Sequence, residues 1–195
     1  PIVFFDRVAN EIVTHKVIVD NYKAGFDATL HLIKRGYKKI AHITSIASLD
    51  ITSERLSGYK HALEENGLTY NENYVQHCNH GGMLAEEIES AVKKLLSMKS
   101  KPDAIVTASD RLTTGVLSTL KKLKLKVPKD LAIVGFTNTN IPELFEPPLT
   151  TVCQPAFEMG QVATELLIKI IESKRPVTEF ETVVLQPELT VRSSS

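Results

Sequence analysis

Apolar residues in the middle of the chain alternate between short continuous runs and longer segments with helical spacing. Four runs rich in Ile, Val and Ala predict buried strands, because a strand covered on both faces need not alternate. They span residues 40–44, 74–78, 104–107 and 131–135. Between them, apolar residues recur every three or four positions, which predicts helices at about 20–35, 53–66 and 83–96. A fourth helix is expected to begin at Ser109-Asp110, two residue types favoured at helix starts.

This alternation of strand and helix predicts an α/β fold. Parallel strands joined by helices require right-handed crossovers, which place helices on both faces of one sheet. After Gly135 the pattern changes, because three prolines between residues 142 and 148 exclude regular structure. A short run at 149–152, a helix from Pro155 and two extended pieces at 181–185 and 188–191 follow.

The composition narrows the class of protein. The 195 residues carry 23 basic and 23 acidic side chains, so the net charge is zero, which argues against a nucleic-acid surface. The lysine-rich stretch 121–129 is interpreted as a solvated helix end. Two cysteines are too few for a disulfide scaffold and fit a reducing compartment. No apolar run approaches the ~18 residues that a membrane helix needs, so we expect no membrane partner.

Motifs for cofactor or metal chemistry do not occur in the sequence. It has no G-x-G dinucleotide fingerprint, no phosphate-binding loop, no H-E-x-x-H and no paired C-x-x-C, so we expect no cofactor. The local cluster His77, Cys78 and His80 cannot direct all three side chains to one point from a strand end, so no metal site is expected. An enzyme is therefore the less favoured class.

Polar residues follow each of the four predicted strands. They are Thr44-Ser45, Asn79-His80, Ser109-Asp110 and the stretch 137–140, and Arg55 lies near the start of the next helix. Ligands of open parallel sheets bind beyond these strand ends, where loop amides and helix N-termini converge. Hydroxyls, amides, one guanidinium and a few carboxylates suit a small polyhydroxylated or amide-bearing ligand. The alternative is that several of these residues are simple helix caps.

Several motifs resemble one family. They are 1–7 (PIVFFDR), 19–21 (VDN), 31–41 (HLIKRGYKKIA), 53–59 (SERLSGY), 102–105 (PDAI), 108–110 (ASD), 127–130 (VPKD), 134–136 (VGF), 148–155 (PLTTVCQP) and 187–193 (PELTVRS). In this order the chain resembles, over its whole length, the effector-binding core of LacI/GalR-family transcriptional regulators, which share their fold with periplasmic sugar-binding proteins.

The resemblance implies a periplasmic-binding-protein-like type I fold with two Rossmann-like lobes of parallel sheet. The chain is then expected to cross between lobes near 19–20, 148–151 and 176–178. Residues 1–19 and 152–177 would form the remnant of an incomplete N-terminal lobe. Residues 20–149 and 178–195 would form the C-terminal effector-binding lobe.

The resemblance also implies ligand-binding positions. Asp6, Arg55, His80, Ser109 and Thr137 fall where the family contacts its ligand, Asp20 falls near the hinge, and Asp110 and Asn138 complete the expected set. Arg55 stands three residues before a Gly-Tyr pair, as a family arginine does, and would donate a fork of hydrogen bonds to ligand oxygens.

Two positions depart from the family pattern. Relatives usually carry an acid after the Gly-Phe or Gly-Tyr pair, where this chain has Thr137-Asn138. His80 stands where relatives often place an aromatic residue that stacks on the ligand, and the chain has no tryptophan. A common hexose is therefore not assumed to be the ligand.

The family begins with a helix-turn-helix domain and further N-terminal lobe units, so we expect this chain to be a fragment of a longer cytoplasmic regulator. Its partners would be a small-molecule effector, a second copy in a homodimer, and operator DNA only through the absent domain. One alternative is a solute-binding receptor that serves a sugar transporter. A third reading is an α/β enzyme that uses Asp110, His80 or Arg55.

Overall fold

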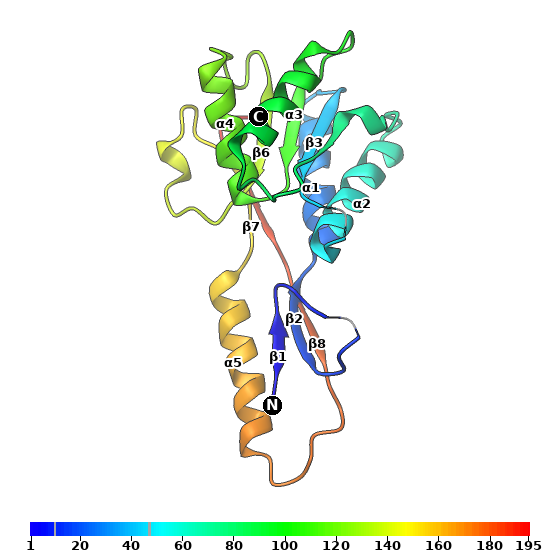
Figure 1. Cartoon of the computed structure of the whole chain (residues 1–195), viewed down its shortest axis with the longest axis vertical. Coiled ribbons are helices and arrows are strands. Elements are labelled where there is room, and N and C mark those ends of the chain that lie inside the picture. Colours follow the sequence, from blue (N-terminus) through cyan, green and yellow to red (C-terminus); the bar gives the residue numbers. More distant parts are fainter. Residues whose placement is uncertain (10, 47) are drawn as a thin grey trace. The chain divides into compact units, whose positions relative to one another are not determined.

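The computed structural model describes residues 1–9, 11–46 and 48–195, which form two compact units. Unit 1 contains residues 1–20 and 154–188, and unit 2 contains residues 21–153 and 189–195. The chain therefore passes between the units three times, after residues 20, 153 and 188 (Figure 1).

Unit 2 is built on a six-stranded sheet with the order β4-β3-β5-β6-β7-β9. Its strands are β3 (Ile40–Thr44), β4 (Val75–His77), β5 (Ala104–Thr107), β6 (Ala132–Phe136), β7 (Thr150–Cys153) and β9 (Glu188–Thr190). The pairs β3–β4, β3–β5, β5–β6 and β6–β7 are parallel. The carboxyl ends of β3 to β7 consequently lie along one edge of the sheet.

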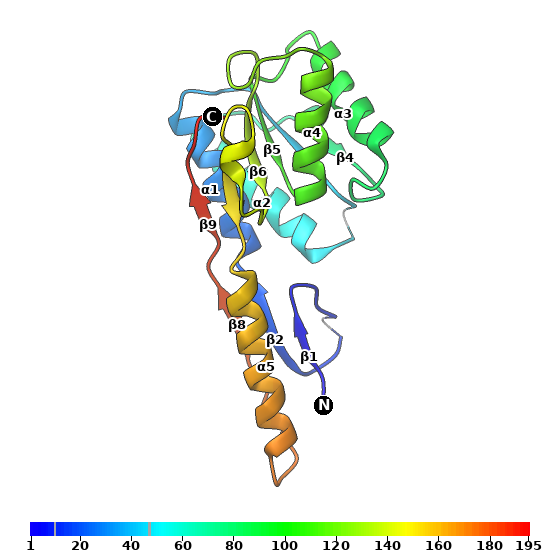
Figure 2. The ribbon, with the colours of Figure 1, turned by 90° about the vertical axis from the view of Figure 1, so that its left-hand side faces the viewer.

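Helices cover both faces of this sheet. Successive strand residues belong to different core clusters: Ile105 packs with α3 and α4, whereas Val106 packs with α1 and α2. The helices are α1 (Asn21–Lys34), α2 (Asp50–Glu65), α3 (Ala85–Ser97) and α4 (Asp110–Lys122), and two 3-10 turns are η1 (Glu72–Tyr74) and η2 (Pro142–Leu144). Figure 2 shows α3 and α4 on one side of β5 and β6, with α1 on the other. Double coverage explains why these strands are continuously apolar.

Helices α1 and α2 approach each other closely at two glycines. A Cβ atom at Gly25 would overlap the main-chain oxygen of Arg55, and one at Gly58 would overlap the main-chain oxygen of Tyr22. Glycine is required at both positions because each neighbour is backbone and cannot rotate away. This contact fixes the distance between α2, which carries Arg55, and the start of α1.

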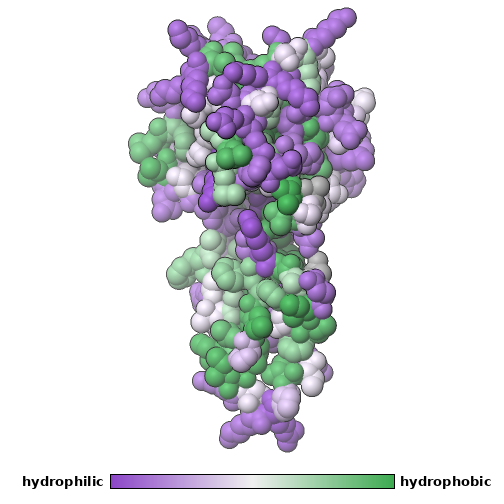
Figure 3. All heavy atoms as spheres, viewed as in Figure 1, coloured by the Kyte–Doolittle hydropathy of each residue, from purple (hydrophilic) through white to green (hydrophobic). Residues whose placement is uncertain are grey.

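Unit 1 contains a parallel three-stranded sheet and one helix. The sheet has the order β1-β2-β8, with β1 at Val3–Phe5, β2 at His15–Val19 and β8 at Thr182–Leu185. Helix α5 (Ala156–Glu172) buries Met159, Ala163 and Leu166 against Val17 and Val19. Many other apolar side chains of unit 1 are exposed, as the green areas of Figure 3 show. They are Ile2, Phe5, Ile12, Val13, Phe157, Ile168, Ile171, Phe180 and Val184.

The predicted α/β class with parallel strands is confirmed, and β3 and β5 occupy the predicted residues. Some boundaries differ: α2 begins at Asp50 and not at 53, and α3 begins at Ala85 and not at 83. In both helices the capping residue is a leucine whose side chain makes no capping hydrogen bond, so no sequence signal marks the start. The hydrophobic pattern did not identify β1 and β2.

The division of the chain also differs from the expected one near its end. Residues 178–188 were expected in the same lobe as residues 20–149. They belong to unit 1 because β8 pairs with β2 from Lys16↔Thr182 to Val19↔Leu185. Residues 152 and 153 belong to unit 2 because β7 pairs with β6. Strand pairing, which proline positions do not reveal, sets these boundaries.

The glycine contact predicts the effect of a single added methyl group. We expect Gly58→Ala to lower the free energy of unfolding by about 1–3 kcal/mol, because the helices must separate to admit the new Cβ. Gly160→Ala is the matched control: it lies in α5 with nothing within 4 Å of the added atom, and should raise stability by about 0.5–1 kcal/mol. Urea unfolding measures both, and equal effects would contradict the packing argument.

Candidate functional site

Arg55 is the buried charge of unit 2, with 4% of its surface exposed. Its Nε donates to Asn21 Oδ1 at 2.9 Å, and one terminal nitrogen donates to the main-chain oxygen of Ala108 at 2.6 Å. Its guanidinium carbon lies 4.2 Å from the ring centre of Phe136, a cation–π contact. Arg55 thus connects α1, the end of β5 and the end of β6.

Thr137, Asp110 and Ser109 follow the two strand ends that Arg55 contacts at Ala108 and Phe136. Thr137 Oγ1 donates to Asp110 Oδ1 and accepts from the main-chain nitrogen of Thr139 at 3.2 Å. Ser109 caps α4 by accepting from Leu112 N at 3.4 Å. The interpretation of Ser109 as a cap is therefore confirmed. Asp110 thus places a carboxylate beside Thr137, the position at which the resemblance led us to expect an acid.

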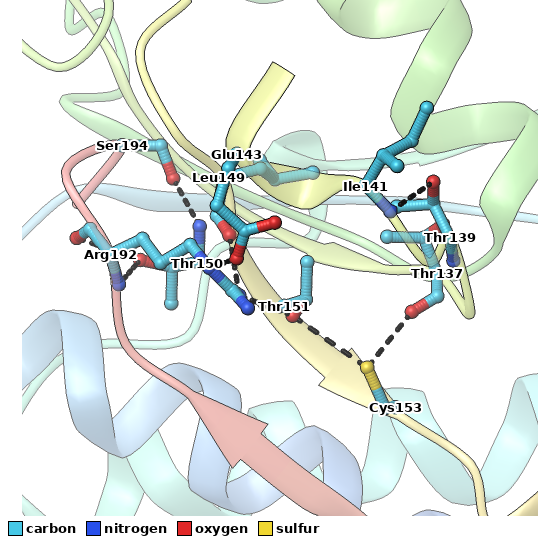
Figure 4. A network of polar contacts seen from close by, with 10 residues as sticks. All are labelled: Thr137, Thr139, Ile141, Glu143, Leu149, Thr150, Thr151, Cys153, Arg192 and Ser194. Carbon is cyan, nitrogen blue, oxygen red and sulfur yellow. Dashed lines mark hydrogen bonds and ion pairs between the residues drawn. The ribbon is translucent and has the colours of Figure 1, made fainter. Parts of the chain in front are cut away.

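A chain of polar contacts runs from Thr137 to the far side of β7 (Figure 4). Cys153 Sγ donates to the main-chain oxygen of Thr137 at 3.2 Å and lies 3.7 Å from Thr151 Oγ1. Thr151 Oγ1 accepts from Arg192 at 3.0 Å, and Arg192 Nε donates to Glu143 Oε1 of η2 at 3.0 Å. The loop after β6 is therefore connected to η2 and to the C-terminal segment.

His80 does not join this group in the structure. Its Nδ1 lies 2.8 Å from Glu87 Oε1, and its main-chain nitrogen donates to Glu87 Oε2 at 3.1 Å. The hydrogen bonds from His80 lower the pKa of the Glu87 carboxyl. The loop itself lies close to the first turn of α4, because a Cβ at Gly82 would lie 3.0 Å from Cβ of Arg111.

The other expected ligand positions are distributed over both units. Asp6 and Asp20 belong to unit 1, where Asp6 Oδ1 accepts from Gln154 Nε2 at 3.0 Å and Asp20 N donates to Leu185 O at 3.0 Å. Asp6 has a positive φ of 61°, which is uncommon for a non-glycine residue. Asn138 is an exposed residue of unit 2. Four expected residues, Arg55, Ser109, Asp110 and Thr137, therefore contact or follow the carboxyl ends of β5 and β6.

Sequence reasoning missed three residues that hold this group in place. Asn21 anchors Arg55, Phe136 lies under its guanidinium, and Cys153 binds the Thr137 carbonyl. Each stands next to or inside a motif that carries the family resemblance. The available signal was that these residues are the sequence neighbours of Asp20, Thr137 and Gln154. Which group each of them contacts could be learned only from the three-dimensional structure.

Two buried polar side chains of β3 lie on the α1/α2 face of the sheet. His42 is fully buried and stacks on Tyr59 with ring centres 5.1 Å apart. Burial, aided by the charges of His77 and Arg55, lowers the pKa of His42 to about 3. Thr44 Oγ1, at the carboxyl end of β3, is buried and has no hydrogen-bond partner among residues 1–9, 11–46 and 48–195.

The histidine and cysteine cluster after β4 is dispersed among separate contacts. His77 Nδ1 lies 2.9 Å from the main-chain oxygen of Ser45, and His80 contacts Glu87. Cys78 is buried, and burial raises the pKa of its thiol to about 11. In the part of the chain that the structure describes, no three His, Cys, Asp or Glu side chains are grouped so that they could hold a metal ion.

Comparison with known families identifies the fold. Residues 29–195 match the family described as the periplasmic binding protein-like domain. The chain belongs to this family.

Across the described ranges, none of its helices combines the length and apolar character needed to cross a membrane.

Similar proteins of this family are transcriptional repressors. The chain is 32% identical over 197 residues to the ribose operon repressor of Haemophilus influenzae, covering all of this chain and 57% of that protein. It is 35% identical over 168 residues to the repressor CytR of Escherichia coli, covering 86% of this chain and 48% of that protein. The chain thus spans about half the length of the curated relatives it matches, and these relatives are not enzymes.

Solved structures agree with this assignment. A transcriptional regulator CelR–cellobiose complex matches with a TM-score of 0.86 and 33% identity over 100% of this chain and 59% of that one. The transcription regulator CcpA of Lactococcus lactis matches with a TM-score of 0.87 and 30% identity, over 100% of this chain and 69% of that one. The resemblance to LacI/GalR-family regulators is confirmed.

His42 predicts how stability depends on pH. Its folded-state pKa of about 3 lies below the ordinary value of 6.5, so between these values the unfolded chain binds a proton that the folded chain does not. His42 therefore costs no stability above pH 6.5, and it lowers stability as the pH falls below that value, by up to about 1.4 kcal/mol per pH unit.

We expect His42→Phe to flatten the decline in the free energy of unfolding between pH 6.5 and 4, measured by urea titration at each pH. Exposed His61, on α2, provides the control substitution His61→Gln, which should leave the decline unchanged. An unchanged slope in His42→Phe would contradict the assignment.

Proposed function

We propose that this chain is the effector-binding core of a LacI-type transcriptional repressor and that it binds a small polar ligand, such as a sugar or a related metabolite. The observation that carries this proposal is the group formed by Arg55, Ser109, Asp110 and Thr137 at the carboxyl edge of β5 and β6. This is the edge where parallel α/β sheets bind their ligands.

The chemistry of the group favours a ligand with several hydroxyl groups. A guanidinium donates, a carboxylate accepts, and threonine and serine hydroxyls do both. A phosphate-rich ligand is disfavoured because Asp110 would repel it. The ribose operon repressor and the cellobiose complex among the relatives support the sugar class.

We further propose that unit 1 is the remnant of the N-terminal lobe and unit 2 the C-terminal lobe. His80 and Asn138 would then be further ligand-binding candidates in unit 2, and Asp6 and Asp20 would be the candidates in unit 1. The exposed apolar side chains of unit 1 support the view that further protein covers them.

Operator DNA would be bound in the cytoplasm by a domain outside these 195 residues. A ligand with unequal affinity for two lobe arrangements would change the affinity for operator DNA, and operator DNA would change the affinity for the ligand by the same factor. A solute-binding receptor remains the alternative function for this fold, but the relatives found are repressors, which favours the regulator.

Arg55→Lys tests the ligand site. Lysine keeps the charge but loses the planar fork, so we expect the affinity for the bound sugar to fall about tenfold to a hundredfold. Isothermal titration of a panel of pentoses, hexoses, disaccharides and nucleosides identifies the ligand with the unmodified chain and then measures each variant.

The matched control is Arg175→Lys, the same chemical change at an exposed position of unit 1. It should leave the affinity unchanged. A ligand that binds equally well to the Arg55→Lys variant and to the unmodified chain would contradict the site, as would a panel without any ligand.

We also propose that the regulator is a homodimer and that η2 takes part in the interface. Ile141 and Leu144 are 55% and 74% exposed, and Arg192 anchors the segment through Glu143. Leu144→Asp should shift sedimentation towards the monomer, because a carboxylate would be buried at an apolar contact. Leu123→Asp is the control, and the proposal fails if the two variants sediment alike.

A further inference from the structure

Basic side chains are concentrated in three segments of unit 2: residues 34–39, 93–103 and 121–130. Each segment leads into a strand, respectively β3, β5 and β6. Together they hold 13 of the 23 lysines and arginines of the chain and only two acidic residues, Asp103 and Asp130. We call these three segments the basic pole.

The three segments form one continuous surface. Strands β3, β5 and β6 are neighbours in the sheet and run parallel, so the segments before them meet at its amino edge. The Asp103 carboxylate accepts from the main-chain nitrogens of Lys38 and Lys39 at 3.1 and 3.0 Å, and Asp103 O accepts from Ala132 N at 3.0 Å. Figure 3 shows hydrophilic side chains gathered over this end of unit 2, where α3 and α4 end.

The positive charge of the basic pole is largely uncompensated. All 13 basic residues are exposed, and Asp130, like Asp103, is engaged by a main-chain nitrogen, that of Lys126 at 2.7 Å. Throughout the described residues, Glu89 is the one carboxylate within ion-pair distance of a basic-pole side chain; it pairs with Lys93 at 2.6 Å and Lys122 at 3.9 Å. A neutral chain therefore carries a strongly positive local field.

Helix stabilisation does not explain this concentration. Lysines in the last turn of a helix interact favourably with its dipole, which accounts for Lys34, Lys94 and the pair at 121–122. Seven other lysines lie beyond the helix ends, where they repel one another and gain nothing from the dipole. They are Lys38, Lys39, Lys99, Lys101, Lys124, Lys126 and Lys129. A partner outside the chain would offset this repulsion.

The residue types of the basic pole favour a polyanion over a protein. A protein interface needs an apolar centre with anchoring side chains, but of the described residues of the pole only Leu123, 38% exposed, is a large exposed hydrophobic. Twelve of the 13 basic residues are lysines, which act as point charges and do not read geometry as arginine does. Such a surface suits repeated phosphate groups.

We propose that the basic pole binds the phosphate backbone of duplex DNA without reading its sequence. Choosing DNA over other polyanions rests on the proposed function, because a repressor held at an operator meets nearby duplex at high effective concentration. Binding would be weak and strongly dependent on salt, since each phosphate contact releases a counterion. The zero net charge of the chain argued against a nucleic-acid surface, but a net charge does not show that 13 of the 23 basic residues lie in one region.

The test is fluorescence anisotropy of the 195-residue chain with a labelled mixed-sequence duplex that lacks inverted repeats, titrated between about 50 and 200 mM salt. The variant replaces Lys38, Lys39, Lys126 and Lys129 by glutamine. We expect it to bind about tenfold more weakly or worse at 50 mM salt, and the slope of log K against log salt to fall by about 3–4.

The control variant carries the same change of charge elsewhere: Lys60→Gln, Lys169→Gln, Lys174→Gln and Arg175→Gln, all at exposed positions. It should retain the affinity and slope of the unmodified chain. Circular dichroism establishes that both variants fold.

Two results of the DNA titration would overturn the proposal: no salt-dependent binding by the unmodified chain at 50 mM salt, or equal losses in both variants. Stronger binding to phosphatidylglycerol vesicles than to DNA, lost with the basic pole, would assign the surface to a membrane and also overturn it. The basic-pole variant should bind the ligand of the proposed function as the unmodified chain does, because its four lysines lie outside the ligand site. Failure of the ligand site and failure of this proposal are therefore distinguishable.

Discussion

The buried guanidinium of Arg55 is the interaction on which the arrangement of the candidate site depends. A charge removed from water must be hydrogen-bonded, and Arg55 satisfies this requirement with Asn21 and the Ala108 carbonyl while resting on Phe136. These partners come from the start of α1 and the ends of β5 and β6. Burying one charge therefore fixes the relative positions of three segments that are distant in sequence.

That arrangement is possible because α1 and α2 touch through glycine. The close approach at Gly25 and Gly58 brings the Arg55 side chain within reach of Asn21. A larger side chain at either position would separate the helices and leave the guanidinium without one partner. Packing and site chemistry are thus connected, because the absence of a Cβ atom at Gly25 and Gly58 permits the buried hydrogen bond between Arg55 and Asn21.

The acid that the family places after β6 is an instructive departure. From the sequence alone, Thr137 removes a carboxylate from the ligand region. In the structure Asp110, at the start of α4, accepts a hydrogen bond from Thr137, so an acid remains next to that position but comes from another element. The contact between the start of α4 and the loop after β6 places this carboxylate, and a motif comparison along the chain does not reveal such a contact.

The sequence by itself determined the α/β class, the residues of β3 and β5, and the strand ends at which Ser109 and Thr137 stand, because burial on both faces leaves a continuous apolar pattern. Only the tertiary structure decided which polar residues meet. Thr137 binds Asp110, Arg55 binds the Ala108 carbonyl, and His80 pairs with Glu87. Strand β8 pairs with β2. Hydrophobic patterns record how deeply each residue is buried, whereas partners depend on strand order and side-chain direction, which are set by contacts between distant segments.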